Sequence, residues 1–149
     1  PDILFWLLAE KPRGVYMVGG QGGHLGFTSS PNFLSMILDY ESPLVTTIDL
    51  NYVQMPQRHV CEIAGDAGWG VCDLDTGLRR IGRRTEQAEA EERIAVARDS
   101  VYELEHQAFL DAVAGKRLPS SPASEAIVSM QIIDAALASW KSGQRVALA

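Results

Sequence analysis

The stretch from Val101 to Ala149 decides the fold: VYELEHQAFLDAVAGKRLPSSPASEAIVSMQIIDAALASWKSGQRVALA. Its pattern predicts a helix, a Pro/Ser turn, a second helix, a glycine stop and a short strand over 146–148. Gly115 should end the first helix, because glycine is the preferred residue just past a helix. The apolar face of that helix consists of Val101, Leu104, Ala108, Phe109, Ala112 and Val113.

The second helix carries its own start and stop signals. We expect the Ser121 hydroxyl to cap it, Pro122 to take the first helical position and Glu125 to lie in the first turn. Gly143 suits a left-handed residue at the end. Two helices this apolar need a surface to cover, and we expect a β-sheet to supply it. The predicted buried face of the second helix is Ala126, Met130, Ile133, Leu137 and Trp140.

Size and composition are those of one ordinary globular domain spanning 1–149. The 149 residues are enough for a hydrophobic core, and 46% of them are hydrophobic and 21% charged. The net charge of −6 and the lack of a basic stripe argue against a nucleic-acid partner. No apolar run is long enough to span a bilayer, so we expect no membrane partner and a cytoplasmic location.

The middle of the chain is strand-like. After a short strand over 15–18, five further segments rich in β-branched and aromatic residues are separated by turns. Such short connections predict an antiparallel meander, because parallel pairing needs crossovers of about a dozen residues. The charged segment 83–93 is expected to be a linker or a frayed helix start. The five predicted strands are 33–40, 44–55, 58–64, 69–74 and 78–81.

The two cysteines have a predictable relationship. If Asp66 and Ala67 form a two-residue hairpin loop, Cys61 and Cys72 lie opposite each other on paired strands. A disulfide is one reading of that pairing. We favour the other, two reduced and half-buried thiols, for a cytosolic chain. Metal binding would need more ligands than this hairpin offers.

The glycine run Gly19-Gly20-Gln21-Gly22-Gly23 is the strongest motif for ligand contact. A dinucleotide-binding turn would need a helix directly after the loop, whereas a strand is predicted here. We therefore favour a mobile loop near a ligand, with a plain connection as the alternative. His24 directly follows this run and is the histidine best placed to touch a ligand. His59 and His106 are expected to be surface or interface residues.

The beginning of the chain reads as the last turns of a helix over 2–10. It starts at Pro1 and at once enters the apolar run ILFWLLA, Ile3–Ala9. We interpret the chain as a piece of a longer protein.

Four stretches resemble the C-terminal domain of the glucose-fructose oxidoreductase / inositol dehydrogenase (Gfo/Idh/MocA) family. Together they span nearly the whole chain. They are 2–8 (DILFWLL, resembling D-x-L-x-W-L), 65–68 (GDAG, resembling G-T-x-G), 102–109 (YELEHQAF, resembling Y-x-x-E-x-x-x-F, with Gly115 and Pro119 after it) and 139–148 (SWKSGQRVAL, resembling S-x-x-x-G-x-x-V-x-L).

The resemblance implies an α+β fold, an open and mainly antiparallel sheet with helices on one face. It implies that the full-length protein is an NAD- or NADP-dependent oxidoreductase acting on a sugar, polyol or related compound. The Rossmann domain, the catalytic residues and the cofactor site would all lie outside this chain. Glu10-Lys11-Pro12 invites a match to the family's E-K-P motif, but its position after the Trp6 helix makes Lys11 a turn residue.

We therefore predict a substrate-binding and oligomerisation domain that is inactive alone. Candidate substrate-binding residues are Gln21, His24 and Arg58; no catalytic, cofactor-binding or metal-binding residue is expected. Alternatives are a non-catalytic dimerisation module and a metabolite-sensing relative. A homo-oligomer is expected through the open face of the sheet, with Phe33, Ile37, Ile48, Leu50 and Tyr52 as the contact residues.

Overall fold

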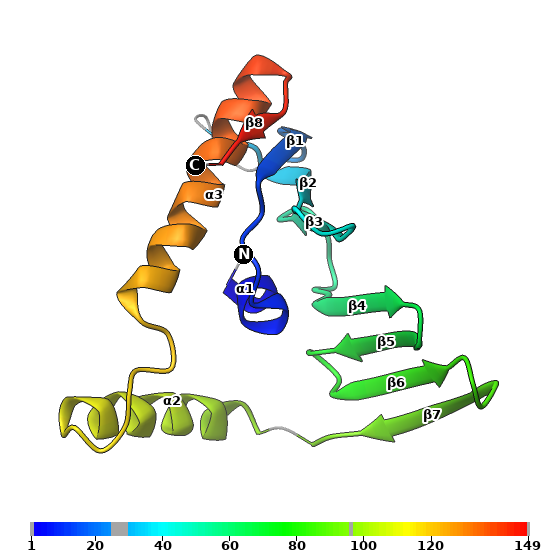
Figure 1. Ribbon diagram of the computed structural model, residues 1–149, viewed down its shortest axis with the longest axis vertical. Helices are drawn as coiled ribbons and strands as arrows, with labels where there is room; N and C mark the ends of the chain where they lie inside the picture. Colours follow the sequence, from blue (N-terminus) through cyan, green and yellow to red (C-terminus); the bar gives the residue numbers. More distant parts are fainter. Residues whose placement is uncertain (1, 25–29, 96, 149) are drawn as a thin grey trace. The chain divides into compact units, whose positions relative to one another are not determined.

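The computed structural model describes residues 2–24, 30–95 and 97–148 (Figure 1). Its elements fall into two compact units, the first formed by Pro1–Val53 with Ser120–Ala149 and the second by Gln54–Pro119. In chain order the elements are α1 (Asp2–Leu8), β1 (Gly14–Gly20), β2 (Phe33–Asp39), β3 (Val45–Asn51), β4 (Val60–Gly65), β5 (Gly68–Asp73), β6 (Leu78–Arg83), β7 (Ala88–Arg93), α2 (Arg98–Val113), α3 (Ala123–Ser142) and β8 (Val146–Ala147).

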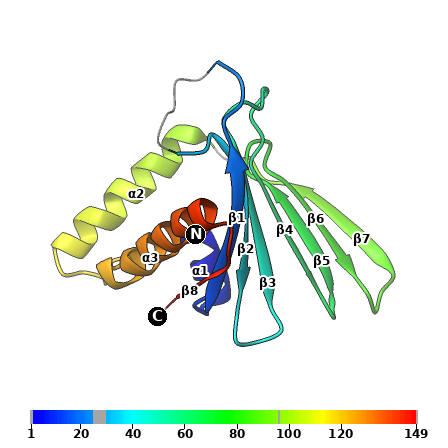
Figure 2. The same cartoon turned by 90° about the horizontal axis from the view of Figure 1, so that it is seen from above.

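The first unit is a four-stranded antiparallel sheet with the order β3-β2-β1-β8. Figure 2 shows α3 lying along one face of this sheet. Alternate residues of β1 and β2 point to that face, since side chains alternate across a strand. The predicted closing strand is confirmed as β8. The core consists of Val15, Met17, Met36, Leu38, Tyr40, Val128, Ile132, Ala135 and Ala136, with Leu4, Phe5 and Leu8 of α1 packed against it.

The predicted buried face of α3 is wrong. Met130 and Ile133 are 56% and 37% exposed, and Ala126 is exposed as well; Leu137 and Trp140 are only half-buried. This helix is apolar on two sides, so helical spacing alone cannot select one. The side with the smaller residues lets the helix approach the sheet closely. The residues buried there are Val128, Ser129, Ile132, Ala135, Ala136 and Ser139.

The ends of the helices follow the expected chemistry with two corrections. Pro122 is the N-cap residue of α3, so it does not take the first helical position, which belongs to Ala123. No side chain caps this end, so Ser121 is not the cap. The Pro122 carbonyl accepts the first hydrogen bonds of the helix instead. Glu125 does lie in the first turn, and Gly143 ends the helix with a φ of 67° in the left-handed region. Gly115, at a φ of 71°, follows α2 in the same way.

The second unit contains α2 and an antiparallel sheet with the order β4-β5-β6-β7. The hairpin register is as predicted: Cys61 lies opposite Cys72, and both thiols are free. The α+β class with open antiparallel sheets and helices is confirmed. The prediction of a single five-stranded meander is wrong, because β2 and β3 pair with β1, whereas β4 to β6 belong to the separate sheet.

The segment 83–93 is also not a linker or a helix start. It closes a hairpin in which β7 pairs with β6. Its acidic residues are matched to the basic residues of β6, which makes a charged segment stable as an edge strand. The ion pairs join Arg79 to Glu92, Arg80 to Glu89 and Glu91, and Arg83 to Glu86.

No helix in the described ranges is long and apolar enough to cross a bilayer.

Asp39 ties together the two ends of the first unit. Its carboxylate accepts hydrogen bonds from Arg145 Nε at 2.8 Å and from Arg13 Nε at 2.7 Å. Arg145 also donates from its terminal nitrogen at 2.9 Å. These bonds, that of Arg145 first and that of Arg13 second, lower the pKa of Asp39 from 3.8 to about 2. The charge cluster thus joins the end of β2 to the segments that precede β1 and β8.

We expect Asp39→Asn to lower the free energy of unfolding at pH 7 by about 1–2 kcal/mol. Because the folded-state pKa is depressed, this contribution is present above pH 4 and is lost as the pH falls through about 2. Urea unfolding at several pH values measures it. Asp49→Asn is the control, since Asp49 accepts a hydrogen bond from Ser35 and has no cation partner among the described residues. A difference that persists unchanged at pH 2 would contradict the assignment.

The last turn of α3 is bonded to the edge of β1. Ser139 is fully buried; its Oγ accepts a hydrogen bond from the Met17 amide at 2.9 Å and donates one to the Gln144 carbonyl at 2.6 Å. Trp140 Nε1 donates to the Gly19 carbonyl at 3.0 Å. Strand β8 pairs with only the first two residues of β1. The helix therefore satisfies two backbone groups of β1 that lie beyond the reach of β8, the Met17 amide and the Gly19 carbonyl.

Ser139→Ala should cost about 1–3 kcal/mol of unfolding free energy, because it leaves the buried Met17 amide without a partner. Thermal or urea unfolding measures the change. Ser124→Ala, at an exposed position of the same helix, should have almost no effect. Equal stability of the two variants would show that the Ser139 bonds contribute nothing.

Candidate functional site

The loop after β1 holds two of the three predicted substrate-binding residues. Gln21 is exposed, and its Nε2 donates to the Ser30 carbonyl at 3.3 Å. His24 is exposed too, and its imidazole forms no hydrogen bond or ion pair with any residue that the structure describes. Residues 25–29 of the predicted loop lie outside the described residues. Two polar side chains with spare hydrogen-bonding capacity thus stand on one short segment, which we call the glycine loop (residues 19–24).

Asn32 holds the base of the glycine loop, and the sequence reasoning missed it. Its side chain is 2% exposed and closes a pair of hydrogen bonds with Gly22: Oδ1 accepts from the Gly22 amide and Nδ2 donates to the Gly22 carbonyl, both at 2.9 Å. The Asn32 backbone amide also donates to the Gly20 carbonyl. A lone asparagine after a proline has no sequence signature, so only the fold reveals this clamp.

Close packing explains two glycines of the loop. A Cβ at Gly22 would lie 3.3 Å from Phe33 Cε1. Gly23 has a φ of 68°, which glycine adopts without strain, and a Cβ there would lie 3.3 Å from Val53 Cγ1. The run is therefore a fitted turn over Phe33 and Val53, and His24 extends from a fixed base.

Arg58, the third predicted residue, belongs to the second unit and is exposed. It lies near Asp73, at the end of β5 where the β5–β6 turn begins. The pKa of Asp73 is lowered there, chiefly by the backbone hydrogen bond from Thr76, and the positive charge of Arg58 adds to the effect. The structure thus groups Gln21 with His24 and gives Arg58 a separate setting.

Only part of the predicted oligomer contact lies on the open face of the first sheet. Phe33 and Ile37 point away from α3, but Ile48 lies opposite Met36 on the helix-covered face and packs against the core. Leu50, opposite Leu34, is on that face as well, so its assignment and that of Ile48 are wrong. Tyr52 follows β3 and is exposed. The exposed apolar residues on the open face are Tyr16, Val18, Phe33, Ile37 and Val45.

The part of the chain that the structure describes contains neither a metal-binding cluster nor the strand–loop–helix arrangement of a dinucleotide site. No three His, Cys, Asp or Glu side chains cluster there as a metal site would require. The next element that the structure describes after the glycine loop is the strand β2, whereas a dinucleotide-binding turn needs a helix there. Lys11 lies exposed between α1 and β1, as expected of a turn residue.

Residues 2–148 match the family model described as "Oxidoreductase family, C-terminal alpha/beta domain" of the Gfo/Idh/MocA group. The chain belongs to this family. The match covers almost every residue, so the resemblance seen in four short stretches is confirmed. No curated protein matches the sequence.

Solved structures of oxidoreductases share the fold of this Gfo/Idh/MocA domain. Levoglucosan dehydrogenase in complex with NADH superposes with a TM-score of 0.85 at 14% identity, over 99% of this chain and 47% of that one. Aldose-aldose oxidoreductase from Caulobacter crescentus, complexed with glycerol, gives 0.82 at 16% identity over 99% and 44%.

The WlbA dehydrogenase from Bordetella pertussis, in complex with NADH and UDP-GlcNAcA, gives a TM-score of 0.73 at 17% identity over 99% and 42%. The chain thus spans less than half the length of these three structures. At such identities the likeness establishes the fold.

Asn32→Ala should loosen the glycine loop, because it leaves the amide and carbonyl of Gly22 without their partners. We expect hydrogen exchange of the Gly22 amide to speed up about tenfold or more. The free energy of unfolding should fall by about 1–3 kcal/mol. Gln131→Ala, which removes an exposed amide from α3, is the control. Unchanged exchange at Gly22 would contradict the clamp.

Proposed function

We propose that this chain is the substrate-binding and oligomerisation domain of an NAD(P)-dependent oxidoreductase acting on a sugar, polyol or related compound. The family match over residues 2–148 carries the proposal. Relatives with the same fold support it, since one is a levoglucosan dehydrogenase in complex with NADH and levoglucosan and another holds NADH and UDP-GlcNAcA. The nicotinamide, when bound by the whole protein, supplies the hydride chemistry. A cytoplasmic location stays a prediction.

The role we assign to the glycine loop is recognition of substrate hydroxyl groups. The His24 imidazole can donate one hydrogen bond and accept another, and no described residue competes for it. The Gln21 amide is partly engaged by Ser30. The Asn32 clamp would reduce the entropy lost when a substrate orders the loop. Arg58 remains a candidate for a substrate bearing a negative charge.

In the full-length enzyme we expect His24→Ala to raise KM about 3- to 10-fold with little change in kcat. This corresponds to one lost hydrogen bond that is equally strong in the ground state and the transition state. Steady-state kinetics measure it. His106→Ala on α2 is the control, because that histidine is also exposed. An unchanged KM would remove His24 from the pocket.

A second proposed role is self-association through the open face of the first sheet. Tyr16, Val18, Phe33, Ile37 and Val45 are each at least 37% exposed on that face, which is costly for a monomer. This face also supports the alternative of a dimerisation module without catalysis. A metabolite-sensing relative would keep the ligand loop but lack turnover.

Ile37→Lys should weaken self-association at least tenfold, because each protomer would bury an unpaired charge in the contact. Sedimentation equilibrium measures the change. Gln131→Lys adds the same charge on α3 and should leave association unchanged. A chain that is monomeric at the highest soluble concentration would rule out this contact.

A further inference from the structure

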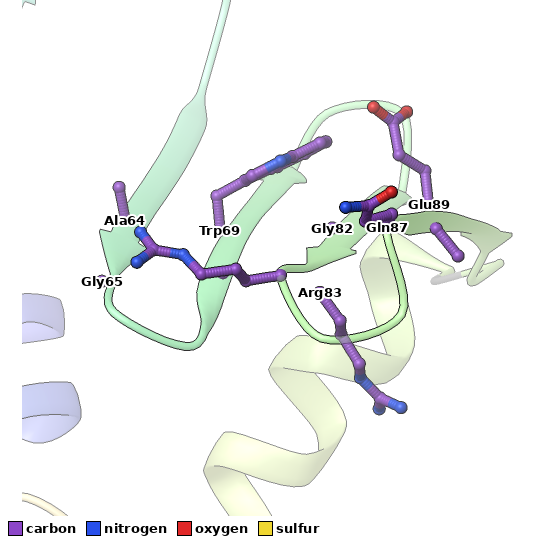
Figure 3. A pocket seen from close by; sticks show the side chains of 10 residues that line it. Ala64, Gly65, Trp69, Gly82, Arg83, Gln87 and Glu89 are labelled. Atoms are coloured by element: carbon purple, nitrogen blue, oxygen red, sulfur yellow. The ribbon is translucent and has the colours of Figure 1, made fainter.

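A hollow of about 440 Å³ lies at one end of the second sheet, where the β4–β5 and β6–β7 turns meet (Figure 3). Its size is in the range of small-molecule sites. Its lining combines glycines, an aromatic ring and four charged or amide side chains. None of the residues predicted for substrate binding contributes to it. The side chains that matter are Trp69, Arg83, Arg84, Gln87 and Glu89.

Trp69 forms a flat platform beside the hollow. Trp69 on β5 lies opposite Gly82 on β6. The indole lies over that glycine, because a Cβ built on Gly82 would be 2.3 Å from Trp69 Nε1. Figure 3 shows the ring extended along the sheet toward Gly82. The Arg80 guanidinium, 5.4 Å from the ring centroid, holds the indole by a cation–π contact. The glycine is thus required for the position of the ring.

Most charges around the hollow are already compensated. Arg83 pairs with Glu86 at 3.3 Å, and Glu89 pairs with Arg80 at 3.3 Å. Arg84 differs from them, because its guanidinium has no carboxylate or hydrogen-bond partner among the described residues, although its backbone amide donates to the Ala67 carbonyl. One cation is therefore available, which matches a ligand with one negative charge.

Gln87 contributes an amide to the hollow, and its backbone has an unfavourable conformation. It has a φ of 47°, a left-handed conformation that glycine would adopt without strain. Its side chain makes no hydrogen bond with the described part of the chain and lies over the hollow in Figure 3. A residue held in the left-handed region, whose amide lines the same hollow as the unpaired Arg84, is a candidate for ligand contact.

We propose that this hollow binds a carboxylate-bearing sugar. The Trp69 indole, held by Gly82 and the Arg80 guanidinium, forms the apolar wall against which the sugar packs. Arg84 binds the carboxylate through two parallel hydrogen bonds, and the Gln87 amide binds a hydroxyl group. A polyphosphate fits less well, because Arg84 is the one guanidinium of the lining that has no carboxylate partner among the described residues. The inference depends neither on the glycine loop nor on the proposed oxidoreductase activity.

The test is a titration of the ¹⁵N-labelled 149-residue chain with D-glucuronate, followed by the Trp69 indole N–H signal. Trp69→Phe assigns that signal among the three tryptophans. We expect a saturable shift with a Kd in the millimolar range, and a response to D-glucose that is at least tenfold weaker. Inorganic phosphate should not saturate the same signals. No saturation with glucuronate up to about 50 mM, or an equal response to phosphate, would overturn the proposal.

Matched variants separate binding from folding. Arg84→Gln should weaken glucuronate binding about tenfold, whereas Arg93→Gln, the same change at the far end of β7, should leave it unchanged. Gln87→Gly should raise the Tm by relieving the left-handed strain, yet weaken binding several-fold. Equal affinities for Arg84→Gln and Arg93→Gln would overturn the site. A Gln87→Gly chain that binds as tightly as the original would do so too.

Discussion

The contact between the last turn of α3 and the open edge of β1 is what the first unit depends on. Among the described residues, no strand lies beside one edge of β1 beyond Val15, since β8 is only two residues long. Ser139 and Trp140 take the place of that strand by bonding the Met17 amide and the Gly19 carbonyl. An unsatisfied buried backbone group would cost as much as a lost hydrogen bond, so the helix position is specified by polar geometry as well as by apolar packing.

The same contact also holds one end of the glycine loop, because that loop begins at Gly19. Gly19 is the residue that Trp140 holds, and Gly22, three residues on, is the residue that Asn32 holds. The glycine loop is therefore fixed at both points before His24 is reached. A recognition loop on a rigid base suits a domain whose proposed work is to orient a substrate for chemistry performed elsewhere in the protein.

The sequence predicted correctly those elements whose ends carry a characteristic residue such as glycine. Gly115 and Gly143 marked the ends of two helices, and the turn from Gly65 to Gly68 set the register that places Cys61 opposite Cys72. The failures are where long-range contacts decide. Helix α3 is apolar on two sides, and whether Ile48, which lies opposite Met36, packs into the core depends on which face of the sheet the helix covers. The pairing of Arg79 with Glu92 could have been found from the complementary charges of 79–84 and 86–92.

The candidate site was predictable only as a loop and a histidine. Its supporting residue, Asn32, has no signal in a single sequence, because one amide becomes a clamp only when the fold buries it beside Gly22. The measurement that tests the central claim most directly is a crystal structure of the full-length protein with its nicotinamide cofactor and a sugar substrate. The account predicts a sugar oxygen about 3 Å from the His24 imidazole. A sugar bound with no atom of residues 19–24 in its contact shell would contradict it.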